Sequence, residues 1–123
     1  MDPVNGVTVI PLETVDRIDL PGGSWSRMLV TGDAVDSATT SLGYSVFKPG
    51  SETASVAHET EEFAYVVDGE GMLRTDEGEV RFGPGDALHI PPETWHAVVD
   101  DSDADVVMVF GFPHPDYPPT ERR

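Results

Sequence analysis

Gly and Pro residues divide the sequence into short runs rich in β-branched and aromatic residues, and this division limits the possible folds more than any other feature. Such runs, with almost no helical periodicity between them, are typical of a β-sandwich or β-barrel. We therefore predict an all-β fold, in one domain that spans residues 1–123. The predicted strands cover residues 6–10, 25–30, 41–48, 63–67, 72–75, 79–82, 87–90, 95–99 and 106–112.

The segments between these runs are predicted turns and loops. Residues 12–20 favour either a turn of helix or an irregular edge, and the small, polar residues 31–40 favour a loop. Residues 76–78 read Asp-Glu-Gly, which predicts a hairpin turn because glycine tolerates a positive φ. The proline-rich tail from Pro113 to Arg123 cannot join a central strand, since proline lacks the N–H that a sheet needs. We expect it to run extended over the surface.

Composition excludes several classes of partner. The chain of 123 residues has 23 acidic and 7 basic residues, a formal net charge of −16. A surface this negative repels phosphate backbones and anionic lipids, so we expect no nucleic-acid or membrane partner. Cysteine is absent, which excludes disulfides and thiolate ligands. The N-terminus lacks the pattern of a secretory signal and no apolar run approaches the ~20 residues of a membrane helix, so we expect a cytoplasmic protein.

Two stretches carry the candidate functional residues. Residues 49–71 place His58 four positions before Glu62, and residues 85–100 contribute His96 after a Pro-Pro turn. Side chains on an extended strand alternate between faces, so positions separated by an even number share a face. Our interpretation is that His58, Glu62 and His96 meet inside a small β-barrel and hold a divalent metal.

The first stretch resembles the first motif of the cupin superfamily. That motif reads glycine, five residues, His-x-His, three or four residues, glutamate, six residues and glycine. Gly50, His58, Glu62 and Gly69 match every spacing, but Val56 stands where the first histidine of the family would be.

The second stretch resembles the second cupin motif, which reads glycine, five residues, Pro-x-Gly, two residues, histidine, three residues and asparagine. Gly85, Pro91 and His96 match it, whereas Glu93 replaces a glycine and Asp100 replaces the asparagine. The resemblance implies a cupin-type double-stranded β-helix, which is a jelly-roll barrel. It also implies a homodimer, because dimers are common among such proteins.

The family metal site has three histidines and one glutamate, so the resemblance implies that His58, Glu62 and His96 are ligands and that Val56 removes the fourth. Two imidazoles and one carboxylate suit Fe(II), and also Mn, Ni or Zn. The implied function is a metal-dependent enzyme acting on a small organic substrate, with dioxygenase-, lyase- or isomerase-like chemistry and these three residues as the catalytic groups. Two alternatives stay open: a non-catalytic small-molecule binding or sensing protein, which Val56 favours, and a metal-free isomerase or cyclase with His58 and His96 as acid and base.

Strand parity extends the prediction to the pocket. Counting from Glu62, Ala64 and Val66 point inward and Phe63 and Tyr65 point to the opposite face. For His89 we favour an outer, structural position, with a role in the pocket left open. The residues predicted to line the pocket are Val56, Ala64, Val66, Tyr44, His89 and Phe110.

Positive charges are scarce, and Lys48 and Arg74 are the two that we single out as candidates for binding an acidic substrate, although lone surface cations more often have no such role.

Overall fold

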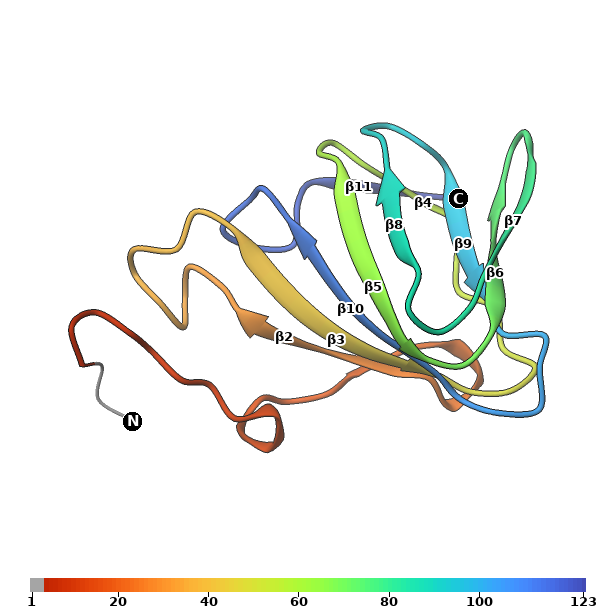
Figure 1. The fold of residues 1–123 in the computed structure, drawn as a ribbon. Helices are drawn as coiled ribbons and strands as arrows, with labels where there is room; N and C mark the ends of the chain where they lie inside the picture. The colour runs from red at the N-terminus through yellow and green to blue at the C-terminus, as the bar shows by residue number, and fades with distance from the viewer. Residues whose placement is uncertain (1–3) are drawn as a thin grey trace.

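The computed structural model describes residues 4–123, which form two antiparallel β-sheets with the hydrophobic core between them (Figure 1). The six-stranded sheet has the order β1 (Ile18–Asp19), β2 (Trp25–Val30), β3 (Ser41–Phe47), β10 (Val106–Phe112), β5 (Glu62–Asp68) and β8 (Ala87–Ile90). The five-stranded sheet has the order β11 (Thr120–Arg122), β4 (Val56–His58), β9 (His96–Val99), β6 (Gly71–Thr75) and β7 (Gly78–Phe82). Two short 3₁₀ turns, η1 (Leu12–Thr14) and η2 (Pro21–Gly23), precede β2. This is the all-β jelly roll that the sequence predicts.

Most predicted strands are confirmed to within one or two residues, and three segments differ. Residues 6–10 form no strand, because the chain turns back at Asn5 and Gly6 and pairs only through a single bridge between Val4 and Val7. The short strand β4 was not predicted separately from β5. The tail is not wholly irregular, because after the last proline, Pro119, the N–H groups are free to pair and β11 forms at the sheet edge.

The core is built from alternate residues of the central strands. On β10, Val106, Met108, Phe110 and Phe112 all point inward, each no more than 8% exposed. Fully burying a side chain of this size contributes about 1.5–3 kcal/mol. The ring of Phe110 lies over Gly43 on β3, where a Cβ atom would come within 2.2 Å of the ring. A glycine at this position therefore lets the ring reach the interior.

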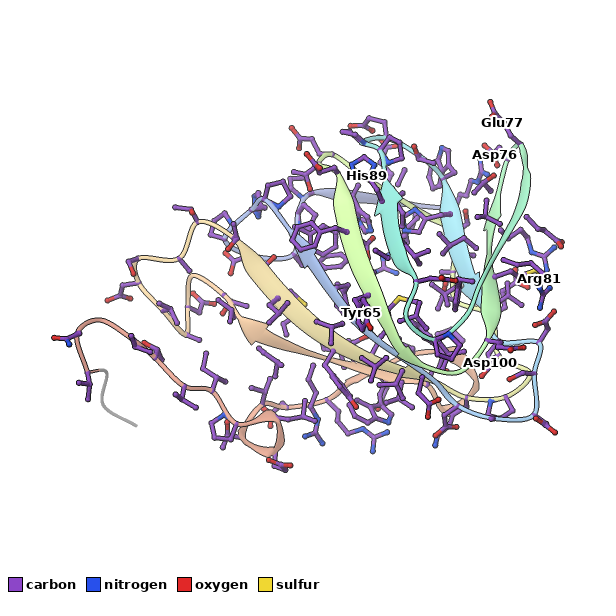
Figure 2. All side chains as sticks on the ribbon, viewed as in Figure 1. Tyr65, Asp76, Glu77, Arg81, His89 and Asp100 are labelled. Carbon is purple, nitrogen blue, oxygen red and sulfur yellow. The ribbon has the colours of Figure 1, made fainter. Side chains whose placement is uncertain are left out.

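The motif glycine Gly69 is required by its surroundings. It has φ +85° in the turn that joins β5 to β6, and a Cβ atom there would lie 2.3 Å from the carbonyl oxygen of Asp105. Only glycine meets both conditions. The predicted hairpin of β6 and β7 is confirmed, with Asp76 and Glu77 at its tip (Figure 2).

Within residues 4–123, no helix has the length and apolar character needed to cross a bilayer. The cytoplasmic location stays a prediction from the sequence.

Candidate metal centre

Three side chains converge from the two sheets. His58 is the last residue of β4 and His96 the first of β9, both in the five-stranded sheet, and Glu62 begins β5 in the facing sheet. Glu62 Oε1 lies 3.1 Å from His58 Nε2 and 3.3 Å from His96 Nε2. One potential ligand atom from each residue lies within 4.8 Å of the others, so a single cation can contact all three.

The convergence has a different cause from the one the sequence analysis gave. His58 and Glu62 do not share a strand, so alternation along one strand does not bring them together. Residues 59–61 instead carry the chain from one sheet to the other, and the two side chains meet across the gap between the sheets. The spacing of four between His58 and Glu62 therefore reflects the three residues that are needed to cross between the sheets.

Hydrogen bonds on the far side of each ring fix the orientation of both imidazoles. His96 Nδ1 donates to the carbonyl oxygen of Thr94 at 2.8 Å. His58 Nδ1 lies 2.7 Å from Thr120 Oγ1, whose own hydrogen is donated to the carbonyl oxygen of Pro118. Thr120 must therefore accept from His58. When each ring is neutral, the proton sits on Nδ1 and the lone pair of Nε2 points at Glu62.

The site is buried and electrostatically prepared for a cation. Both histidines are 4% exposed, and Glu62 Oε1, although close to both rings, is buried without a well-formed hydrogen bond. Burial alone would raise the pKa of Glu62, but its contacts with His58 and His96 hold that pKa below its usual value. Burial lowers the pKa of His96, yet Glu62 and the Thr94 carbonyl together raise it above its usual value. An anionic oxygen without a proper donor, facing two nitrogen lone pairs, fits a divalent cation.

Aromatic rings pack around His58. The rings of Phe112 and Tyr117 meet it edge-on, with centroids 4.9 and 5.3 Å away. Tyr117 comes from the tail and is 41% exposed, so it stands at the edge of the site. Burial and the charge of Glu62 raise the pKa of Tyr117, which keeps its phenol protonated.

A cavity of about 310 Å³ adjoins the three side chains. Its volume is at the lower end of the range for small-molecule sites. Ser26, Ser45 and Thr53 contribute hydroxyl groups, but most of the lining is apolar. The main apolar residues of the lining are Met28, Phe47, Val98, Met108, Phe110 and Phe112.

The sequence profile of the cupin domain matches residues 43–112, which is more than half of the chain. The chain belongs to the cupin family.

The chain is also similar to individual proteins. An uncharacterized protein of Methanocaldococcus jannaschii, MJ1618, is 31% identical over 77 residues, and the match spans 62% of this chain and 62% of that protein. The polyketide cyclase RemF from Streptomyces resistomycificus superposes with a TM-score of 0.78 at 24% identity, over 94% of this chain and 84% of that one. Lactobacillus farciminis oxalate decarboxylase gives a TM-score of 0.80 at 17% identity, over 90% of this chain and 34% of that one. At these identities, the two structures establish the fold alone.

Four of the residues predicted to line the cupin pocket point inward. Val56 and Phe110 line the cavity. Ala64 and Val66 are 5% and 0% exposed, as parity predicts, but they pack in the hydrophobic core and do not line the cavity.

Two residues predicted to line the pocket lie outside it. Tyr44 faces Trp25, with 6.0 Å between the ring centroids, because it alternates on β3 with the inward-facing Ser45. His89 pairs in register with the exposed Phe63 and is itself exposed, and its Nε2 lies 3.0 Å from Glu61 Oε1 (Figure 2). The prediction that Tyr44 and His89 line the pocket is therefore wrong. The outer, structural position that we favoured for His89 agrees with the structure.

The tail supplies residues that the sequence analysis missed. Thr120 lies opposite His58 in the pairing of β11 with β4, and Tyr117 packs on the His58 ring. The only feature of the sequence that pointed to a paired segment here was that the prolines of the tail end at Pro119. The cations singled out earlier lie elsewhere, because Lys48 pairs with Asp105 and Arg74 pairs with Glu52 and Glu79.

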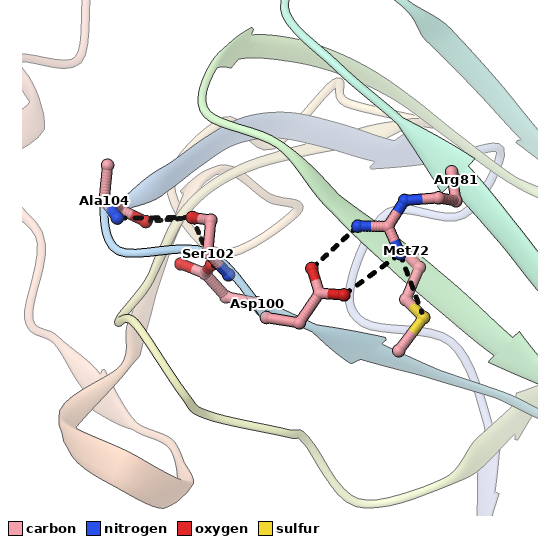
Figure 3. Close-up of polar contacts among 6 residues, drawn as sticks. Met72, Arg81, Asp100, Ser102 and Ala104 are labelled. Carbon is pink, nitrogen blue, oxygen red and sulfur yellow. Dashed lines mark hydrogen bonds and ion pairs between the residues drawn. The ribbon is translucent and has the colours of Figure 1, made fainter.

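The two departures from the second motif have local structural consequences. Glu93 has φ +61°, the left-handed conformation that suits the glycine of the family, and its N–H donates to the His58 carbonyl at 2.7 Å. Asp100 is fully buried, and its Oδ1 accepts hydrogen bonds from the N–H and hydroxyl of Ser102 (Figure 3). Beside it, Arg81 pairs with Asp101. Asp100 therefore organises the loop before β10 and does not line the cavity.

Proposed function

We propose that this cupin is a divalent-metal-dependent enzyme that acts on a small organic molecule in the cavity. The observation that carries the proposal is the convergence of His58, Glu62 and His96 on one point of the cavity wall, with both Nε2 lone pairs directed inward. A metal site open to a substrate-sized cavity is an arrangement suited to catalysis.

The donor set favours Fe(II), with Mn, Ni or Zn as alternatives, because two imidazoles and one carboxylate are typical of non-haem iron sites. When bound, such a cation acts as a Lewis acid on a substrate oxygen. Val56 contributes no donor, which leaves coordination open for the substrate.

The residues of the chain perform the remaining tasks. Apolar side chains, including Met28 and Met108, exclude water from the cavity. Glu62 is the one carboxylate in the lining within residues 4–123, so it is both a ligand and the available proton acceptor. The Tyr117 phenol offers a proton donor at the edge. These groups suit oxygen insertion, or lyase or isomerase chemistry through an enolate-like state. A polyketide cyclase and an oxalate decarboxylase share this fold, so the fold itself is compatible with catalysis.

A second candidate rests on the distances within the site. Contacts of 3.1 and 3.3 Å allow protonated imidazoles to form ion pairs with Glu62, so the buried carboxylate can be paired without a metal. This favours either a binding or sensing protein or a metal-free isomerase or cyclase in which His58 and His96 exchange protons with the ligand.

A turnover screen separates the candidates. Protein loaded with Fe(II), Mn(II), Ni(II) or Zn(II) is mixed with diketones, catechols and thiols, and oxygen uptake and product formation are followed. The proposal expects turnover with one metal, abolished in Glu62→Gln and retained in His89→Ala, which changes an exposed histidine outside the site. Turnover in metal-free protein, or binding without turnover in every metal form, supports the second candidate instead.

The homodimer stays a prediction. A dimer interface could form on the outer face of β5, where a row of large apolar side chains is exposed. These are Phe63, Tyr65 and Val67, which are 45%, 51% and 49% exposed.

A further inference from the structure

Charge in the cavity differs from charge over the rest of the molecule. The chain has a formal net charge of −16, yet apart from the imidazoles the cavity lining within residues 4–123 carries one anion, Glu62, and one cation, Arg122. These charges cancel, so a bound divalent cation makes the cavity positive. An anionic group is therefore favoured here, while the outer surface repels it.

Arg122 is also the cation without a partner. Within residues 4–123, its guanidinium forms no hydrogen bond, ion pair or contact over an aromatic ring, although acidic side chains outnumber basic ones more than threefold. The other six cations all have partners. These are Lys48 with Asp105, Arg74 with Glu52 and Glu79, Arg81 with Asp101, Arg123 with Asp76, Arg27 with the Leu12 carbonyl, and Arg17 with the Trp25 ring.

Strand register directs Arg122 toward the metal centre. On β11, Thr120 is opposite His58 and Arg122 is opposite Val56, and residues two apart on a strand share a face. Thr120 bonds the His58 ring, so this face is the inner one. Arg122 is consequently the cross-strand neighbour of Val56, where the first motif lacks its usual histidine, and both residues line the cavity.

We propose that Arg122 binds an anionic group of the substrate, most simply a carboxylate, and so makes this cupin selective for small organic acids with an apolar body. The inference rests on the proposed function for the reaction itself, but binding of the anion by Arg122 can be tested separately. A guanidinium binds a carboxylate through two parallel charge-assisted hydrogen bonds, and the apolar lining accommodates the remainder of the molecule.

The test uses benzoate and benzamide, which have nearly the same shape and differ in charge. Their dissociation constants are measured by NMR titration of the metal-free and the Zn(II)-loaded protein, at fixed ionic strength. We expect Arg122→Gln to lower the preference for benzoate over benzamide about tenfold in both forms. Arg123→Gln is the matched control, because Arg123 is the next residue and bonds Asp76 outside the cavity, and it should change the preference less than twofold.

Two results overturn the inference. The first is an unchanged preference in Arg122→Gln, which assigns anion binding to the metal or to another group. The second is an equal loss in both arginine variants, which indicates general surface charge. If Zn(II) does not bind, Zn(II) is excluded as the metal of the proposed function, while the metal-free titration still decides the role of Arg122. Thermal melts of each variant confirm that the fold is intact.

Discussion

Val56 on β4 lies directly opposite His96 on β9 in the five-stranded sheet, and both side chains line the cavity. The position where the family motif has a further histidine is therefore next to the candidate ligand His96 in space. The valine gives the candidate metal centre three potential protein ligands, and in the proposed function it leaves room for a substrate.

Restoring a histidine at this position should strengthen metal binding. Val56→His adds an imidazole beside His96, and we expect about tenfold or greater tightening, since even outer-shell partners change metal affinity about 10–100-fold. Competition with a chromophoric chelator measures the change. Val56→Leu, which adds bulk without a donor, should not tighten binding. An affinity of Val56→His equal to or below that of the wild type would show that position 56 does not face the metal.

Thr120, in the C-terminal tail, should affect how tightly the candidate metal centre binds a metal ion. Replacing this residue by valine keeps the shape but removes the acceptor for His58 Nδ1, and we expect about tenfold weaker metal binding. Thr120→Ser keeps the hydroxyl and should restore most of the affinity. ¹⁵N NMR of the imidazoles provides an independent readout, because the Nδ1–H tautomer of His58 should be less populated in the valine variant. If both variants behave alike, the hydroxyl has no positioning role.

The metal-free protein should lose stability as the pH rises above neutrality. The pKa of His96 is raised in the folded state, so its contribution is complete below the unfolded value of about 6.5 and is lost as the pH rises through the folded value. The pKa of Glu62 is lowered, so its contribution is lost only in acid. Urea denaturation of the wild type and His96→Gln, from roughly pH 5 to 9, measures the difference between them. A difference in stability that grows with pH would contradict this assignment.

The fold should be less stable with Glu93 than with glycine at the same position. Its φ of +61° costs a non-glycine residue roughly 1–2 kcal/mol, and glycine costs an extra 0.5–1 kcal/mol of chain entropy. Glu93→Gly should therefore stabilise the fold by about 0.5–1 kcal/mol in chemical denaturation. Glu93→Ala retains the strained backbone and should bring no gain. Destabilisation by the glycine would indicate a stabilising role for the Glu93 side chain.

The sequence predicts this fold well because its signals are local. Gly69 at a tight turn and the hairpin at Asp76 and Glu77 are set by residues close together in the chain, and alternation correctly divides Ala64 from Tyr65. Motif spacing likewise anticipates the meeting of His58, Glu62 and His96, although the actual route is a crossing between sheets.

The parts that the sequence did not predict depend on contacts between distant segments. The tail pairs with β4 across more than 60 residues, which places Thr120 and Arg122 at the site, and no local pattern encodes that pairing. The proline-rich composition pointed instead to an irregular segment. The position of Tyr44 depends in the same way on which face of β3 meets the core.

The most direct test of a metal centre at these three side chains is anaerobic calorimetric titration of metal-free protein with Fe(II). The wild type and His89→Ala should each bind one ion per chain, and His96→Ala should bind at least tenfold more weakly because it loses a ligand. The absence of saturable binding by the wild type, or unchanged binding in His96→Ala, would contradict the account.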